Sequence, residues 1–318
     1  MVTGRGILHL WPGCTVSRRG GESSLCGGLT GEEAMKVTPV APALGARVDG
    51  IDLSVPLNDR QLVELTDLQD EYEVLFFDGQ SLSVVDQQRL AQQFGELLEY
   101  PYVKGFADAP YVVEIAKMED EKVNFGGLWH TDSSYLQRPP ALTLLYGEQI
   151  PPLGGDTLFA SMTKAFEALS EGMQNLLRPL NAIFSAEQGG GYAVREFRQN
   201  KNLDQAPQQA VHPVVRRHPR SRKLALYVNG AHTVRFVDMT EEESAPLLQF
   251  LYHHQQRPEF SCRFQWQPGS LAIWDNRTTH HNPLNDYHGY RRVMRRVMTL
   301  GEIPLGESAV AGESGVGC

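Results

Sequence analysis

Two stretches of the chain repeat apolar residues at helical spacing. One helix is predicted to begin near Asn58, because the three leucines that follow it at three-residue intervals fall on one face. Another follows Ser83, with Asp86 three residues later as in a capping box, and it carries Leu90 and Phe94 on its apolar side. Both segments are therefore predicted to be amphipathic helices.

Two further helices are predicted from start and stop signals. The first covers residues 163–178, where Pro179 ends it because proline has no N–H to donate. The second follows Thr240, since Glu243 completes a capping box with it. Pro246 falls early in this second helix, so the pattern does not decide whether its first turns are helical.

Short apolar runs rich in β-branched and aromatic residues predict strands. The candidates are residues 74–77, 111–115, 142–146, 224–228, 270–274 and 291–300. They outnumber the helices and do not alternate with them regularly. This order disfavours a doubly wound parallel sheet and favours a β-sandwich or barrel with helices packed outside.

Composition narrows the class of protein. The 318 residues are 41% hydrophobic and 21% charged, which is ordinary for a globular protein, and the net charge of −9 argues against nucleic-acid binding. The apolar run at residues 141–146 is far shorter than the ~20 residues that span a bilayer. The four widely spaced cysteines favour a reducing cytoplasm. A small-molecule partner is expected, and a homo-oligomer stays open.

The two ends of the chain differ from its middle. Residues 1–34 are rich in Gly, Ser and Arg without a hydrophobic period, which predicts a disordered extension before a domain at residues 35–305. An organelle-targeting segment is a second interpretation of that arginine content. Residues 306–318 are small and polar and are expected to form a loose tail.

The sharpest chemical feature is the segment Trp129-His130-Thr131-Asp132. If it is extended, His130 and Asp132 point to the same side, which supplies two of the three ligands of a two-His-one-carboxylate iron(II) site. The pair His280-His281 offers the third ligand. A polar turn and a surface histidine pair explain the same residues without a metal.

A strand near the C-terminus carries four arginines. Arg292 and Arg296 lie four residues apart and share one face, whereas Arg291 and Arg295 share the other. One face can form a cationic wall for carboxylates, because a guanidinium binds a carboxylate through two charge-assisted hydrogen bonds. A solvated edge that discourages aggregation is the alternative.

Taken together, these motifs resemble the TauD/TfdA family of dioxygenases. The resemblance runs from about Val37 to Pro304. Its segments are Leu44-Gly-Ala-Arg-Val-Asp-Gly-Ile-Asp-Leu53, Phe94-Gly-Glu-Leu97, Trp129-His-Thr-Asp132, Gly154-Gly-Asp-Thr157, His212-Pro-Val-Val215, Trp274-Asp-Asn-Arg277 and Arg292-Val-Met-Arg-Arg296. The order and spacing of the segments make the resemblance specific.

The resemblance implies a mostly β fold with flanking helices, built on a double-stranded β-helix or jelly-roll core. It implies that His130, Asp132 and His281 bind Fe(II), with His281 rather than its neighbour selected by the family spacing. Thr157 and Arg292 match the residues that hold the cosubstrate 2-oxoglutarate. O2 is the other substrate that this chemistry requires.

The substrate end departs from the family's taurine-specific members. Arg296 matches an arginine that lies near the cosubstrate and meets the sulfonate of taurine. Tyr100 stands where those members have a histidine, and Gly126 where they have an asparagine, which predicts a roomier, more aromatic pocket. Tyr102 and Ser133 are further candidates for substrate contact. The expected substrate is a small organic anion, not clearly taurine.

The expected reaction is hydroxylation of a C–H bond coupled to conversion of 2-oxoglutarate to succinate and CO2. The carboxylate of Asp132 favours hydroxylation, since related halogenases lack it; desaturation and bond cleavage after hydroxylation stay open. The alternatives are a non-catalytic metal- or ligand-binding protein of the same fold and a zinc hydrolase. The first is disfavoured because every ligand and arginine position is intact, and the second would leave the paired arginines and the threonine without a use.

Overall fold

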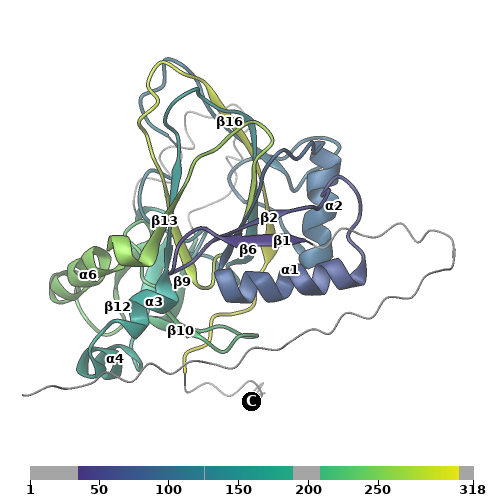
Figure 1. Ribbon diagram of the computed structural model, residues 1–318. Coiled ribbons are helices and arrows are strands. Elements are labelled where there is room, and N and C mark those ends of the chain that lie inside the picture. Colours follow the sequence, from purple (N-terminus) through teal and green to yellow (C-terminus); the bar gives the residue numbers. More distant parts are fainter. Residues whose placement is uncertain (1–34, 125, 189–207, 308–318) are drawn as a thin grey trace, which may run out of the picture. The chain divides into compact units, whose positions relative to one another are not determined.

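The computed structural model describes residues 35–124, 126–188 and 208–307 (Figure 1). The predicted N-terminal extension and residues 308–318 lie outside this part. The chain is held as far as Glu307, which pairs with Arg178, and Arg217 N donates to Leu305 O at 2.8 Å. Among the residues described, no helix is long and apolar enough to cross a membrane.

Helices form where the caps predict them. Asn58 and Gln61 exchange side-chain and backbone hydrogen bonds at the start of α1, and Ser83 and Asp86 do so at the start of α2. Thr240 caps α6, which continues through its internal proline. These three predictions are confirmed. The helices are α1 (Asp59–Tyr72), α2 (Val84–Phe94), α3 (Met162–Glu167), α4 (Glu171–Leu177) and α6 (Glu241–Gln255), with a 3-10 turn η3 (Pro258–Phe260).

The predicted single helix over residues 163–178 is wrong. The chain forms α3 and α4 instead, with a break at Leu169 and Ser170. Leu169 is buried in the core, and the Ser170 side chain accepts a hydrogen bond from Met173 N, which caps a new helix. The apolar spacing continues across the break, so periodicity alone does not reveal it.

The strands form one large sheet and several small ones. The large sheet has the order β1-β2-β3-β14-β6-β16-β4, with β5 also paired to β16; the small sheets are β13-β7-β15, β12-β8-β9 and β10-β11. The bounds are β1 (Lys36–Pro39), β2 (Ala46–Asp49), β3 (Val74–Phe77), β4 (Leu97–Leu98), β5 (Val113–Lys117), β6 (Pro140–Gln149), β7 (Thr157–Ser161), β8 (Asn181–Ser185), β9 (Gln209–Pro213), β10 (Val215–Arg217), β11 (Leu224–Leu226), β12 (Thr233–Phe236), β13 (Ser261–Phe264), β14 (Leu271–Asp275), β15 (Thr279–Pro283) and β16 (Arg292–Leu300).

The predicted strands recur with small shifts. β3 has the predicted bounds, and β16 begins one residue later than expected. The strand expected at residues 111–115 begins two residues later because Tyr111 N donates to the Gln88 side chain rather than to a neighbouring strand. The chain is thus mostly β with flanking helices, as predicted.

Alternation along the strands builds two layers. On β3, Phe76 faces β7 and β13 and stacks on Phe264 with 4.1 Å between ring centroids. The residues on either side of Phe76 face the other way, into a core with Leu65 of α1 and Leu90 of α2. The large sheet therefore packs against the β13-β7-β15 sheet on one face and against two helices on the other, where Figure 1 shows α1 and α2. This two-sheet sandwich is the jelly-roll core.

Candidate active site

A cluster of two histidines and an aspartate lies between the two sheets. The ligand atoms of His130, Asp132 and His281 all lie within 4.8 Å of one another, and all three side chains are buried. His130 N donates to His281 O at 3.0 Å, and His281 N donates back to His130 O at 2.8 Å. The backbone therefore fixes the spacing of the two histidines before any ion binds.

The route by which Asp132 joins the cluster differs from the prediction. The segment at residues 129–132 is not a strand: only His130 forms a β-bridge, and a turn follows it. Ser133 in that turn has φ +44°, and Asp132 N donates to the Asn276 side chain at 3.2 Å. The expected convergence of His130 and Asp132 occurs, but the turn produces it and the side-chain alternation of a strand does not.

Hydrogen bonds orient the ligand atoms. His130 Nδ1 lies 2.6 Å from Leu128 O, and since a carbonyl can only accept, Nδ1 carries the proton and Nε2 keeps its lone pair. Thr143 Oγ1 donates to Asp132 Oδ2 at 2.7 Å, and Arg296 Nη1 donates to Oδ1 at 3.0 Å. Both side chains are thereby held with an electron pair toward the centre of the cluster.

The charges suit a divalent cation. Burial would raise the pKa of Asp132, but Arg296 and the two histidines outweigh burial and lower that pKa to about 2. Burial lowers the pKa of His130 and holds that of His281 well below its usual value. At neutral pH the cluster thus holds one carboxylate and two neutral imidazoles, which is the protonation state that metal ligands require.

One cavity joins this cluster to the predicted cosubstrate residues. Its lining consists of Ile115, His130, Asp132, Leu145, Thr157, Trp274, His281, Pro283, Arg292, Met294 and Arg296. Trp266 Nε1 donates to Thr157 Oγ1 at 2.9 Å, which leaves the hydroxyl proton of Thr157 for another acceptor. Arg292 is buried, and its Nε and Nη2 find no hydrogen-bond acceptor among the described residues. The cavity therefore offers a hydroxyl and a guanidinium to an anion beside the cluster.

The arginines of β16 divide between the two faces as predicted. Arg292 and Arg296 line the cavity, whereas Arg295 on the other face donates to Leu82 O and lies 4.5 Å from the centre of the Tyr146 ring. The alternative of a solvated edge is wrong, because β16 lies between β6 and β5 and these three arginines are buried.

A family model for the taurine catabolism dioxygenase TauD, TfdA family matches residues 36–298 of the chain. The chain belongs to this TauD/TfdA family. An alkylsulfatase of Acinetobacter baylyi is 32% identical, over 89% of this chain and 90% of its own length. An alpha-ketoglutarate-dependent sulfate ester dioxygenase of Pseudomonas putida is 30% identical, over 86% and 91%.

A solved structure has the same fold. The crystal structure of a putative alpha-ketoglutarate-dependent taurine dioxygenase from Burkholderia xenovorans superimposes with a TM-score of 0.76 at 32% identity, over 87% of this chain and 96% of that one. The expected double-stranded β-helix is confirmed. As a TauD/TfdA protein, the chain is an iron(II)- and 2-oxoglutarate-dependent dioxygenase that uses O2.

A cluster of three tyrosines, called here the aromatic wall, lies against Arg296, which lines the cavity and donates to Asp132. Arg296 Cζ lies 4.5 Å from the centre of the Tyr100 ring, and Tyr100 packs edge-on against Tyr102 at 5.8 Å. Tyr102 contacts Tyr135 at 5.9 Å, and the Tyr135 hydroxyl lies 3.3 Å from Ser133 Oγ. The four candidate substrate residues of the sequence, which are Tyr100, Tyr102, Ser133 and Arg296, thus lie close together.

Sequence reasoning missed two members of this wall. Tyr135 packs edge-on against His232 with 4.9 Å between ring centroids, and His232 stands 6.0 Å from the ring of His130. Tyr135 lies only three residues after Asp132, so a helical or turn conformation there was the available signal. His232 follows β11 in a separate part of the chain, and nothing near it in the sequence points to the cluster.

The expected enlargement of the pocket at Gly126 is wrong. Gly126 has φ +76°, and a Cβ built on it would lie 2.9 Å from His130 Cε1. The imidazole ring occupies the space that a side chain would take. Glycine is required here for close approach of the backbone to His130, and it does not open the pocket.

A second His-carboxylate cluster lies outside this cavity, at Asp70, His218 and Asp275. Arg277 donates to both oxygens of Asp275 at 2.7 and 2.6 Å, and Arg220 pairs with Asp70. His218 Nδ1 accepts from Ser221 N at 2.9 Å, so Nε2 carries the proton and donates to Asp275 at 3.0 Å. No electron pair of the imidazole is left for a metal.

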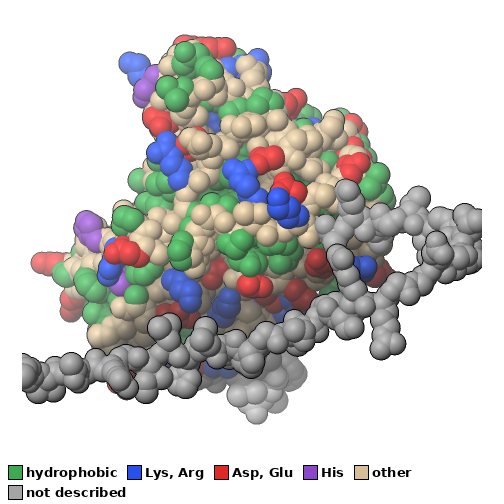
Figure 2. All heavy atoms as spheres, viewed as in Figure 1, with side chains coloured by type: hydrophobic (Ala, Val, Ile, Leu, Met, Phe, Trp, Pro, Cys, Tyr) green, Lys and Arg blue, Asp and Glu red, His purple; other side chains and the backbone are tan. Residues whose placement is uncertain are grey.

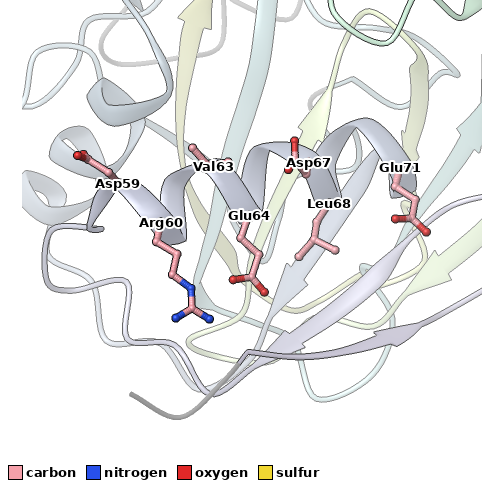
Figure 3. A pocket seen from close by; sticks show the side chains of 7 residues that line it. All are labelled: Asp59, Arg60, Val63, Glu64, Asp67, Leu68 and Glu71. Carbon is pink, nitrogen blue, oxygen red and sulfur yellow. The ribbon is translucent and has the colours of Figure 1, made fainter. Parts of the chain in front are cut away.

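The outer face of α1 forms a shallow hollow, with the acidic side chains of Glu64, Asp67 and Glu71 along it (Figure 3). Asp67 pairs with Arg220. On the face in Figure 2, acidic and basic side chains are interspersed, and the described residues there show no continuous basic stripe. Neither surface resembles an anion site, and the buried cavity remains the site of chemical interest.

Proposed function

We propose that His130, Asp132 and His281 hold iron(II), that Thr157 and Arg292 hold 2-oxoglutarate, and that the enzyme hydroxylates a small organic anion other than taurine. The observation that carries the proposal is the single buried cavity onto which all five side chains open. In it a neutral pair of imidazoles and a carboxylate stand beside a buried guanidinium without a carboxylate partner.

Each residue has a separate task. Arg292 binds the distal carboxylate of 2-oxoglutarate through charge-assisted hydrogen bonds, and Thr157 adds a hydroxyl donor. The iron, when bound, supplies activation of O2 coupled to decarboxylation of the cosubstrate. The aromatic wall excludes water and holds the substrate carbon near the metal side of the cavity.

The substrate class follows from Arg296 and Tyr100. Arg296 is a buried cation whose guanidinium lies against the Tyr100 ring, next to Asp132. An anionic head group that meets Arg296 would place a neighbouring C–H bond beside the cluster. We infer that the head group is a sulfate ester or sulfonate, supported by the sulfate ester named for one relative and by a tyrosine in the position of the taurine-binding histidine.

For an alkyl sulfate the products balance simply. Hydroxylation of the carbon that bears the ester oxygen gives an unstable adduct, whose C–O bond breaks to release sulfate and an aldehyde. One O2 and one 2-oxoglutarate are consumed, and succinate and CO2 are formed. For a sulfonate the same hydroxylation releases sulfite.

The composition supports a proposal for the cellular compartment and the class of substrate. Iron(II) needs a reducing compartment, and Cys262 is a buried free thiol, so we propose a cytoplasmic enzyme. The net charge of −9 supports a small-molecule substrate in place of nucleic acid.

The test is a substrate screen under iron(II), ascorbate and 2-oxoglutarate, with succinate and O2 consumption measured together. Alkyl and aryl sulfates, alkylsulfonates and aryloxyacetates are compared with taurine. The expected result is stimulation by a sulfate ester or sulfonate well above that by taurine. If taurine proves the best substrate, the substrate proposal is overturned; if nothing releases succinate, the assignment of the cavity is overturned.

A further inference from the structure

A buried lysine that forms no hydrogen bond with the described residues lies near the Arg292 end of the cavity. Lys117, the last residue of β5, has only 3% of its surface exposed, and its Nζ forms no hydrogen bond with the described residues. A buried ammonium group is costly unless an anion or several acceptors surround it. The structure therefore holds a positive charge that lacks a counterion.

Sheet geometry places this charge beside Arg292. β5 and β16 are antiparallel, and Lys117 lies directly opposite Arg292 in their register. Directly opposite residues point to the same face of a sheet. Ile115, two residues earlier on β5 and so on the same face as Lys117, lines the cavity. Lys117 is therefore the next residue of that row, level with Arg292.

Tyr287 connects the two cations. Lys117 Nζ lies 4.5 Å from the centre of the Tyr287 ring, and Arg292 Cζ lies 5.9 Å from the same centre. An aromatic face attracts a cation, but it does not neutralise the charge. Asp156, whose negative charge acts on Arg292, forms its ion pair with Arg263 at 2.6 Å instead. Within the described residues, two neighbouring buried cations thus lack a carboxylate.

We propose that Lys117 is a second cation for the distal carboxylate of 2-oxoglutarate, acting together with Arg292. The inference rests on the proposed function, because it takes the Arg292 end of the cavity as the cosubstrate site. Without an anion the two positive charges repel each other, and a bound carboxylate removes that repulsion while it gains attraction to both. The pair therefore selects 2-oxo acids that carry a second carboxylate.

The experiment compares two ligands that differ only in that group. Binding of 2-oxoglutarate and of 2-oxovalerate, which has the same chain length without the distal carboxylate, is measured by calorimetry on the Mn(II)-loaded protein. Lys117→Met removes the charge and keeps most of the buried volume. The expected result is a dissociation constant for 2-oxoglutarate raised at least about tenfold, which is ~1.4 kcal/mol, with 2-oxovalerate unchanged.

Two further variants complete the test. Lys164→Met removes an exposed lysine that pairs with Glu167 and should change neither constant, while Lys117→Arg should retain most of the affinity for 2-oxoglutarate. If Lys117→Met does not fold, Lys117→Gln takes its place. Equal losses for both ligands, or no loss for 2-oxoglutarate, would overturn the role of Lys117. Failure of the unaltered protein to bind 2-oxoglutarate would instead overturn the proposed function.

Discussion

Among the described residues, two clusters combine histidine with aspartate, and only one is arranged to receive a metal. At His130, Asp132 and His281, one arginine faces one carboxylate, and His130 Nε2 keeps its lone pair. At Asp70, His218 and Asp275, arginines pair with both carboxylates. Both nitrogens of the His218 ring form hydrogen bonds with other residues of the protein. The hydrogen bonds around a His-carboxylate group, more than its composition, decide whether it can bind a cation.

The largest effect is expected from removing the carboxylate of the first cluster. Asp132→Ala should abolish substrate-dependent succinate release and lower the iron content, and it should also lower stability, because it leaves the buried Arg296 without its carboxylate. Activity, bound iron and the circular dichroism spectrum are measured on the same preparation. Turnover at the wild-type rate would refute the assignment of the triad.

The two adjacent histidines of β15 test the register of the first cluster. His281→Ala should lose iron, whereas His280→Ala should keep it, because side chains alternate along β15 and only His281 lines the cavity. Iron per protein after desalting distinguishes the two variants. Equal losses would show that the register of the site is wrong by one residue.

Loss of Arg292 should weaken the binding of 2-oxoglutarate without removing the metal. Arg292→Ala leaves a carboxylate of 2-oxoglutarate without its guanidinium, and hydrogen bonds between charged groups contribute roughly 1.5–3 kcal/mol each. The concentration of 2-oxoglutarate needed for half-maximal rate should rise tenfold to a hundredfold or more, at about 1.4 kcal/mol per decade. An unchanged requirement would place the cosubstrate elsewhere.

The second cluster should respond in stability alone. Burial would raise the pKa of Asp275, but Arg277 and His218 outweigh it and hold the pKa far below its usual value. The resulting stabilisation is present above the ordinary carboxyl pKa and is lost as the pH falls toward the folded-state value. Asp275→Asn should therefore lower the free energy of unfolding by about 3 kcal/mol at pH 7.

Denaturant unfolding at several pH values tests this, with iron content and turnover as controls. The deficit of Asp275→Asn should shrink in acid, since the wild-type carboxylate becomes protonated there. Loss of iron in this variant would contradict the distinction between the two clusters.

The sequence predicted those features that arise from interactions between residues close together in the chain. Helix caps at Asn58, Ser83 and Thr240 involve residues three apart, so the pattern alone locates them. His130 and Asp132 are close in sequence and were found, although the turn that unites them was not. His281 was chosen over His280 from the spacing of the family motif, because hydrophobic periodicity does not distinguish the two.

Residues whose role arises from tertiary packing were not predicted. His232 lies beside His130 although it belongs to the segment after β11. Lys117 becomes a candidate residue only because the sheet places it opposite Arg292. The break at Ser170 was missed because a buried Leu169 satisfies helical spacing on either side of it. The first two cases require knowledge of which segments become neighbours in the fold.

The backbone at Gly126 also limits how the specificity of this enzyme can change by mutation. An asparagine there, as in the taurine-specific members of the family, would place its Cβ 2.9 Å from His130 Cε1, so the ring or the backbone would have to shift. That substitution would be harmful until the loop before His130 had first been rebuilt. A change of specificity that uses position 126 therefore requires the backbone to move before the side chain can be exchanged.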